Sequence, residues 1–169
     1  LVIESDAALA MTLRVARALD AGETSEHEKM LVRVGTAVGK YWICKRTPAH
    51  AYEAMECIGG SGVMEDCIMP RLFRESPVNS IWEGSGNVQC LDVLRALSKT
   101  PAVVDAFFAE VAITQGADRE LDALTHSLAR DLREAGEPGD LEYRARDVVD
   151  RMALAIQGSL LVRHAPACV

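Results

Sequence analysis

Apolar side chains recur along the sequence at intervals of three and four positions, which is the period of an amphipathic helix. No stretch alternates apolar and polar residues for long enough to predict a strand. Residues 3–20 are apolar around most of their circumference, as in a helix enclosed by neighbours, and the polar run 20–28 then interrupts them. The pattern therefore predicts an all-α protein.

The next helix is expected to begin after Ser25, because Ser25 followed by Glu28 is a capping-box signature. It continues past Pro48 to Ile58, where the sequence GGSG at 59–62 ends it. Its apolar stripe consists of Met30, Val34, Ala37, Tyr41 and Cys44. A further helix is predicted from about Ser85 to Ser98, after a short connecting segment.

Three more helices are predicted in the second part of the chain. Thr100 and Pro101 are suited to the N-cap and the first position of a helix. Leucines from 121 to 132 and apolar residues from 141 to 156 repeat at helical spacing, on either side of the break at 135–140. We expect an up-and-down helical bundle over residues 1–98, followed by a smaller antiparallel helical bundle over residues 99–169.

Composition narrows the class of protein. The 169 residues are 49% hydrophobic, and 25 acidic side chains outweigh 18 basic ones, giving a net charge of −7. This charge argues against a general surface for nucleic acids or anionic membranes. No signal peptide and no apolar run near 20 residues is recognised, so we expect a cytoplasmic protein without a membrane span. Because a helical pattern is already in progress at Leu1, we also expect a fragment of a longer protein.

Five cysteines, at positions 44, 57, 67, 90 and 168, form no CxxC pair and lie at no metal-ligand spacing with histidines. Neither a zinc site nor a disulfide framework is indicated. We expect reduced and mostly buried thiols.

The stretch ECIGGSGV at 56–63 admits two interpretations. A Gly-Gly-x-Gly after a helix is usually a termination and a turn. Alternatively, the glycines allow a flat ligand or a phosphate to approach the backbone. The stretch does not follow a strand, so it is not a Rossmann fingerprint.

The stretch SIWEGSGN at 80–87 places one carboxylate, Glu83, between an indole and a Gly-Ser-Gly turn. Glu83 is either an acid in the first turn of the following helix or a base activated by burial beside Trp82. Arg71, Arg74 and Asn79 precede it, and such a density of polar groups and glycines between helices favours a functional interpretation.

The sequences AMECIGGSGVMED at 54–66 and MPRLFRESPVNSIWEGSGNVQCLDVLRAL at 69–97 resemble the C-terminal α-helical domain of the acyl-CoA dehydrogenase family. The resemblance is strongest to the branch that contains the adaptive-response flavoprotein AidB. It covers residues 1 to about 98, and the remaining helices correspond to the additional C-terminal helices of that branch.

The resemblance implies a flavin-dependent oxidoreductase that uses FAD to dehydrogenate an acyl-CoA thioester between its α and β carbons. Glu83 matches the catalytic base, and Trp82 and Gly84 adjoin the substrate. Residues matching cofactor-binding positions of the family are Glu56, Gly59, Gly60, Ser85 and Asn87. Glutamate at 56 and asparagine at 87 replace the glutamines of many members.

The resemblance also implies a homo-oligomer, a dimer or a tetramer. The family's N-terminal helical domain and middle β-domain are absent from this sequence. The isolated chain is therefore expected to be inactive and to bind FAD weakly or not at all.

Two other functions are considered. The first is a DNA-associated protective flavoprotein with little dehydrogenase turnover, and the second is a structural oligomerisation module. Residues 99–169 contain 8 basic and 12 acidic side chains. Arg144, Arg146 and Arg151 are the best DNA-contact candidates, but Asp147 and Asp150 interleave with them, so a solvated helical face is expected and DNA binding is not favoured.

Overall fold

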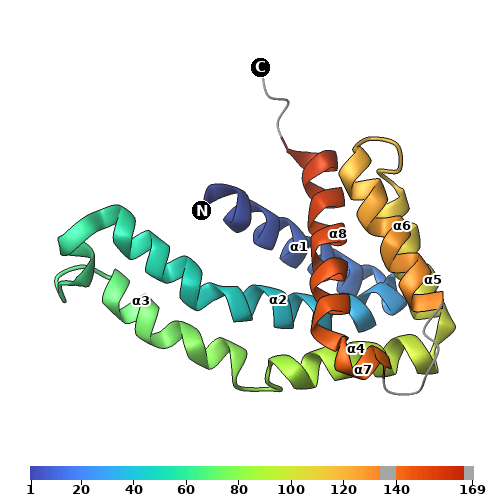
Figure 1. The fold of residues 1–169 in the computed structure, drawn as a ribbon, viewed down its shortest axis with the longest axis horizontal. Helices are drawn as coiled ribbons and strands as arrows, with labels where there is room; N and C mark the ends of the chain where they lie inside the picture. The colour runs from blue at the N-terminus through green and yellow to red at the C-terminus, as the bar shows by residue number, and fades with distance from the viewer. Residues whose placement is uncertain (134–139, 166–169) are drawn as a thin grey trace.

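A computed structural model describes residues 1–133 and 140–165, and every regular element within those ranges is helical (Figure 1). The first part of the chain forms α1 (Val2–Ala21), α2 (Glu26–Ile58), the 3₁₀ turn η1 (Gly59–Val63), α3 (Met69–Glu75), the 3₁₀ turn η2 (Ser76–Ser80) and α4 (Gly86–Lys99). The second part forms α5 (Pro101–Ala112), α6 (Arg119–Arg133), α7 (Asp140–Tyr143) and α8 (Ala145–His164). The prediction of an all-α fold is confirmed.

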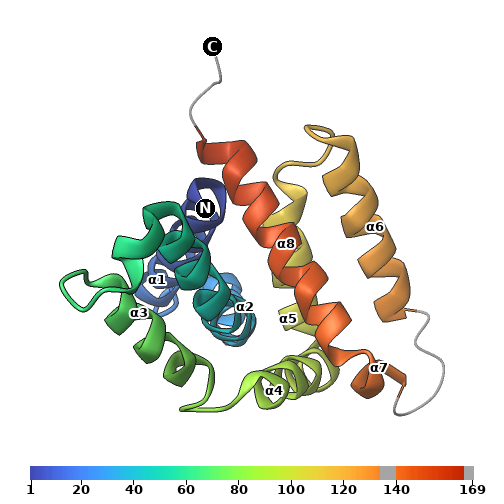
Figure 2. The same ribbon diagram turned by 60° about the vertical axis from the view of Figure 1, so that its left-hand side comes forward.

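Helix α2 is the central element, and its 33 residues contact α1, α3, α4, α5 and α8. It begins at Ser25, whose hydroxyl oxygen accepts the backbone N–H of Glu28 at 3.3 Å. Only this half of the predicted capping box forms, because the Glu28 carboxylate pairs with Arg14 of α1 instead. Beyond α2 the chain reverses, and α3 and η2 run back beside the C-terminal half of α2 (Figures 1 and 2).

Helix α8 packs on both parts of the chain. It lies against α6 and α5 and also against α1, α2 and α4 (Figure 2). The indole Nε1 of Trp42 in α2 donates to Oε1 of Gln157 in α8 at 2.9 Å. The division at residues 98–99 stays a prediction, and a continuous core crosses it. The continuous helical pattern from Leu141 to Ile156 is divided at Arg144, whose backbone leaves the helical conformation between α7 and α8.

A buried ionic cluster joins four helices. The carboxylate of Glu110 on α5, with a side chain only 3% exposed, accepts hydrogen bonds from Arg14 of α1 at 2.7 and 2.9 Å and from Arg163 of α8 at 2.7 Å. Burial alone would raise the pKa of Glu110, but the hydrogen bonds from the two guanidinium groups outweigh it and hold this pKa below its ordinary value. Arg14 also binds Glu28 of α2, so the cluster fixes α1, α2, α5 and α8 together.

The expectation that α1 is enclosed on all sides is wrong for this chain. Ala7, Met11 and Ala18 are buried, but the opposite face is exposed. Its exposed apolar side chains are Val2, Ile3, Leu9, Leu13 and Leu19. A helix that is apolar all round thus has only one of its faces covered here.

The expectation of mostly buried thiols is also wrong among the described cysteines. Cys90 is buried, Cys44 and Cys67 are partly exposed, and Cys57 is exposed. Cys168 lies outside the described residues. Within residues 1–133 and 140–165, no helix combines the length and the apolar character that crossing a membrane requires.

Candidate functional site

Glu83 lies in a tight turn between η2 and α4. The turn starts with backbone hydrogen bonds from the N–H groups of Ile81 and Trp82 to the carbonyl of Val78, at 2.9 and 3.1 Å. Glu83 then adopts φ 55°, the one positive φ of a non-glycine residue in the described chain. This left-handed conformation is costly for a residue with a side chain, typically on the order of 1–3 kcal/mol. Residues held in this way cluster at functional sites.

Two neighbours hold Glu83 in this conformation. Gly84 has φ 105°, and a Cβ there would lie 2.5 Å from Nε2 of Gln89. The Gln89 side chain folds back from α4, and its Nε2 donates to the carbonyl oxygens of Glu83 at 3.0 Å and of Gly84 at 3.4 Å. Sequence reasoning missed Gln89. Its position four residues after the N-cap Ser85 does suit a side chain that returns to the preceding turn.

The N-terminus of α4 follows this turn directly. Ser85 is the N-cap residue, but its hydroxyl does not cap the helix, so the first N–H groups of α4 have no partner from it. Gly86 is buried and packs against the ring of Tyr41 in α2, where an added Cβ would lie at a contact distance of 3.4 Å. Oδ1 of Asn87 accepts Nε of Arg146 from α8 at 2.6 Å. An uncapped helix end thus lies next to Glu83. It is held in place by packing on α2 and by the hydrogen bond from α8.

The buried groups under this helix end remain protonated at neutral pH. Burial, reinforced by the nearby Asp150 carboxylate, raises the pKa of the Cys90 thiol to about 11. The same two causes raise the pKa of the Tyr41 hydroxyl well above its ordinary value. Neither the Cys90 thiol nor the Tyr41 hydroxyl is therefore a nucleophile, since each would have to lose its proton to become reactive.

The predicted residues Glu56, Gly59 and Gly60 lie at the far end of α2. Gly59 adopts φ 77°, and a Cβ at Gly59 or Gly60 would meet no atom within 4 Å, so this backbone is open to a neighbour. Gly62 is the sterically required glycine, because a Cβ there would lie 2.7 Å from the carbonyl oxygen of Met55. The Glu56 carboxylate accepts the hydroxyl of Tyr52 at 3.2 Å.

The structure therefore divides the predicted site residues into two groups. The first comprises Trp82, Glu83, Gly84, Ser85 and Asn87, and the second comprises Glu56, Gly59 and Gly60. Gly86, which lies between Ser85 and Asn87 of the first group, packs against Tyr41 and Lys45 of α2. Glu56 lies eleven residues beyond Lys45, roughly 16 Å further along the helix. One small ligand cannot touch both groups, whereas a long one can.

Two details differ from the sequence analysis. Trp82 is 55% exposed, so burial of Glu83 beside the indole does not occur in this chain alone. Glu83 precedes the N-cap of α4 by two residues, and the first turn of α4 contains no acidic residue, so its interpretation as a first-turn acid is wrong. The nearby arginines are engaged with other carboxylates, Arg71 with Glu75 and Arg74 with Glu65.

A comparison with known protein families identifies the chain. The sequence pattern of the family described as "Acyl-CoA dehydrogenase, C-terminal domain" matches residues 1–98. The chain belongs to the acyl-CoA dehydrogenase family. The match includes both groups of predicted site residues, so the family resemblance of the sequence is confirmed.

Known relatives extend the similarity beyond residue 98. The chain is 36% identical over 165 residues to the acyl-CoA dehydrogenase homologue AidB of Escherichia coli, covering 98% of this chain and 29% of AidB. It is 42% identical over 88 residues to acyl-CoA dehydrogenase family member 11 of Caenorhabditis elegans, covering 52% of this chain and 14% of that protein.

A solved structure supports the same assignment. Caenorhabditis elegans ACDH-11, crystallised in complex with C11-CoA, superimposes with a TM-score of 0.78 at 30% sequence identity. The superposition covers 96% of this chain and 31% of ACDH-11. The chain thus spans less than one third of the length of these family members.

Proposed function

We propose that this chain supplies the catalytic base and part of the flavin site of an acyl-CoA dehydrogenase-like oxidoreductase that introduces an α,β double bond into an acyl-CoA thioester. The observation that carries this proposal is the left-handed Glu83, held by Gly84 and Gln89 next to the uncapped start of α4. Backbone strain at one carboxylate, maintained by two neighbours, is typical of a catalytic group.

In this mechanism the Glu83 carboxylate removes the proton from the α-carbon of the thioester. The hydrogen bonds from Gln89 fix the carbonyl groups of Glu83 and of the following Gly84, so the base keeps its position during proton transfer. The acyl chain lies over the exposed Trp82 and excludes water from the carboxylate, which leaves it less solvated and more reactive. General-base catalysis of this kind contributes about 10²–10⁴-fold to the rate.

The residues present fit FAD as the cofactor. Bound FAD supplies the acceptor for the hydride that leaves the β-carbon. Ser85 and the first N–H groups of α4 offer donors to the flavin, because the serine hydroxyl is not used as a cap. Gly59 and Gly60 offer an open backbone to the dinucleotide portion, with Glu56 oriented by Tyr52.

The separation of the two groups along α2 supports a cofactor site shared between subunits of a homo-oligomer, with Glu56, Gly59 and Gly60 contributed to a neighbouring copy. The acyl-CoA substrate class is supported by ACDH-11, which was crystallised with C11-CoA. We place the protein in the cytoplasm. The chain by itself is expected to bind FAD weakly and to be inactive, since it corresponds to less than a third of its relatives.

The alternative of a DNA-associated protective flavoprotein has less support. Arg144 and Arg151 both pair with Asp131 and Asp147, and Arg146 binds Asn87. These guanidinium groups are already engaged, whereas affinity for DNA depends on basic groups that reach phosphates.

The proposal is tested on the full-length protein that carries this chain. Anaerobic titration with acyl-CoA thioesters of different chain lengths should bleach the visible absorbance of the oxidised flavin with at least one of them. If no thioester reduces the flavin while dithionite does, the dehydrogenase proposal is wrong. DNA retention at physiological salt by the same preparation would then favour the alternative.

A further inference from the structure

A cavity lies away from Glu83, between α5 and α6, and is also lined by residues of α4 and α7. Its volume is about 640 Å³, within the range of small-molecule sites. Helices α5 and α6 are consecutive, yet α5 packs mainly on α2 and α6 packs mainly on α8, and this leaves the space between them. Apolar side chains form most of the lining, among them Leu97, Val104, Phe108, Val111, Leu121 and Leu132.

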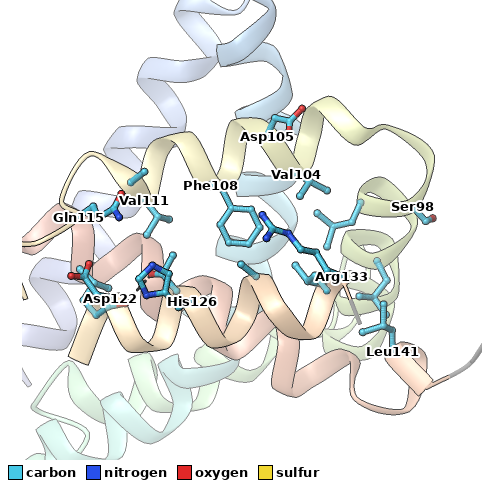
Figure 3. Close-up of a pocket in the computed structure, with 17 residues that line it drawn as sticks. Ser98, Val104, Asp105, Phe108, Val111, Gln115, Asp122, His126, Arg133 and Leu141 are labelled. Atoms are coloured by element: carbon cyan, nitrogen blue, oxygen red, sulfur yellow. Dashed lines mark hydrogen bonds between the residues drawn. The ribbon is translucent and has the colours of Figure 1, made fainter. Parts of the chain in front are cut away.

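The charged side chains that line this cavity differ in whether they point into it. Figure 3 shows Phe108 pointing from α5, and His126 and Arg133 pointing from α6, into the space between the two helices. Asp105 points away from Phe108 in the same view. The Asp122 carboxylate accepts the backbone N–H of Gly116 at 3.0 and 3.2 Å. The charged group directed into the apolar space is therefore a guanidinium, while the nearby carboxylates are directed elsewhere.

The cavity is also elongated. From Leu121 to Arg133 the lining residues follow α6 for twelve residues, roughly 18 Å at the rise of an α-helix. Figure 3 shows the Arg133 guanidinium beside the Phe108 ring, part-way along this length. The apolar lining from Phe108 to Leu121, with this cation beside it, is complementary to a single alkyl chain that ends in an anion. A guanidinium binds a carboxylate through two parallel hydrogen bonds, which makes Arg133 selective for a carboxylate.

We propose that the cavity between α5 and α6 binds an unesterified single-chain carboxylic acid, with its carboxylate on Arg133 and its alkyl chain along Phe108, Val111 and Leu121. This site is separate from the proposed dehydrogenase site and does not depend on it. His126 adds a hydrogen-bonding imidazole midway along the cavity.

The test is calorimetric titration of the 169-residue chain with dodecanoate below its micelle concentration. The chain concentration is one at which sedimentation gives a single species. Saturable binding of one dodecanoate per chain is expected, with much weaker binding of dodecanol and dodecyltrimethylammonium. Arg133→Gln should weaken the binding of dodecanoate by about tenfold or more, since it removes a charge-assisted hydrogen-bonded pair. Arg130→Gln is the matched control on the same helix, because Arg130 does not line the cavity, and it should leave the affinity unchanged.

A second variant tests the location of the alkyl chain. Ala129→Phe places a ring inside the cavity and should abolish binding, with folding checked by circular dichroism. If this variant does not fold, Arg133→Gln alone decides. Absence of saturable dodecanoate binding, or equal affinity for wild type and Arg133→Gln, would overturn the proposal. A third outcome would also overturn the proposal: the wild-type chain does not bind dodecanoate but forms a dimer, and Ala129→Phe dissociates that dimer. This outcome would assign the cavity to contacts between copies of the chain.

Discussion

At the scale of single residues, Glu83 is the unusual feature of this chain. A glutamate gains nothing intrinsically from φ 55°, so the turn must impose this conformation. It does so because Gly84 and Gln89 close the chain tightly between η2 and α4. The residue proposed as the base is thus the one at which the fold stores backbone strain.

This strain predicts an unusual mutational response. Glu83→Gly removes the left-handed penalty of about 1–3 kcal/mol, against a glycine entropy cost of about 0.5–1 kcal/mol. The free energy of unfolding, measured by urea denaturation, should therefore rise by about 1 kcal/mol. The control Glu53→Gly, at an exposed position inside α2, should lower it by about 1 kcal/mol. Similar losses in the two variants would show that Glu83 is not strained.

The sequence predicted site residues in this turn but not its geometry. Glu83 and Ser85 were selected by their resemblance to family positions, and their roles stay predictions. The positive φ of Glu83 was not predictable, because a bulky side chain is rarely found there and no local propensity encodes it. The hydrogen bonds from Gln89 were not predictable either, because they depend on the residue at which α4 starts. A prediction of that start that is wrong by one residue does not place Gln89 beside the turn.

At the scale of elements, the Glu110 cluster connects α1, α2, α5 and α8. Arg14 and Glu110 are 96 residues apart, so no local pattern pairs them, although the helices that carry them were predicted. The same limit applies to α1, whose apolar pattern predicted a helix without showing which face the rest of the chain covers. The helix starts after Ser25 and at Pro101 were predicted, because caps and prolines act locally.

Glu110→Gln should destabilise the fold strongly. It leaves two mostly buried guanidinium groups without this counter-charge, at a cost of about 3 kcal/mol in the free energy of unfolding. The exposed pair partner Glu26 provides a control, and Glu26→Gln should cost less than about 0.5 kcal/mol. Chemical denaturation at pH 7 distinguishes the two, and equal effects would contradict a stabilising role for the cluster.

The same cluster predicts a pH dependence. Because the pKa of Glu110 is lower in the folded than in the unfolded state, its contribution is complete above the ordinary glutamate pKa. It is lost as the pH falls through the lower, folded value. Wild type should therefore lose stability on acidification more steeply than Glu110→Gln does. Parallel curves for the two proteins below pH 5 would contradict this assignment.

At the scale of the whole molecule, large apolar side chains remain exposed on two surfaces. One is the outer face of α1, and the other follows α3, η2 and the start of α4 and includes Leu72, Val78, Ile81, Trp82 and Val88. Exposed apolar surface of this extent marks contacts with other domains or subunits. The relatives AidB and ACDH-11 are more than three times as long as this chain.

The isolated chain should therefore self-associate. Sedimentation velocity at micromolar concentration should show species larger than a monomer of 18.3 kDa. Leu13→Lys on the exposed face of α1 should reduce this association without lowering stability, because Leu13 is outside the core. A monodisperse monomer for wild type would contradict the interpretation of these surfaces as interfaces.

The central claim is that Glu83 is the base that removes the α-proton of an acyl-CoA thioester. The most direct measurement compares anaerobic flavin bleaching by an acyl-CoA substrate in the full-length protein and in its Glu83→Gln variant. Glutamine keeps the shape of the side chain but cannot take up the proton, so both proteins should bind flavin and thioester. Bleaching by Glu83→Gln should be slower by about 10²–10⁴-fold, while the control Glu75→Gln should bleach at the wild-type rate. Equal bleaching rates for wild type and Glu83→Gln would contradict the account.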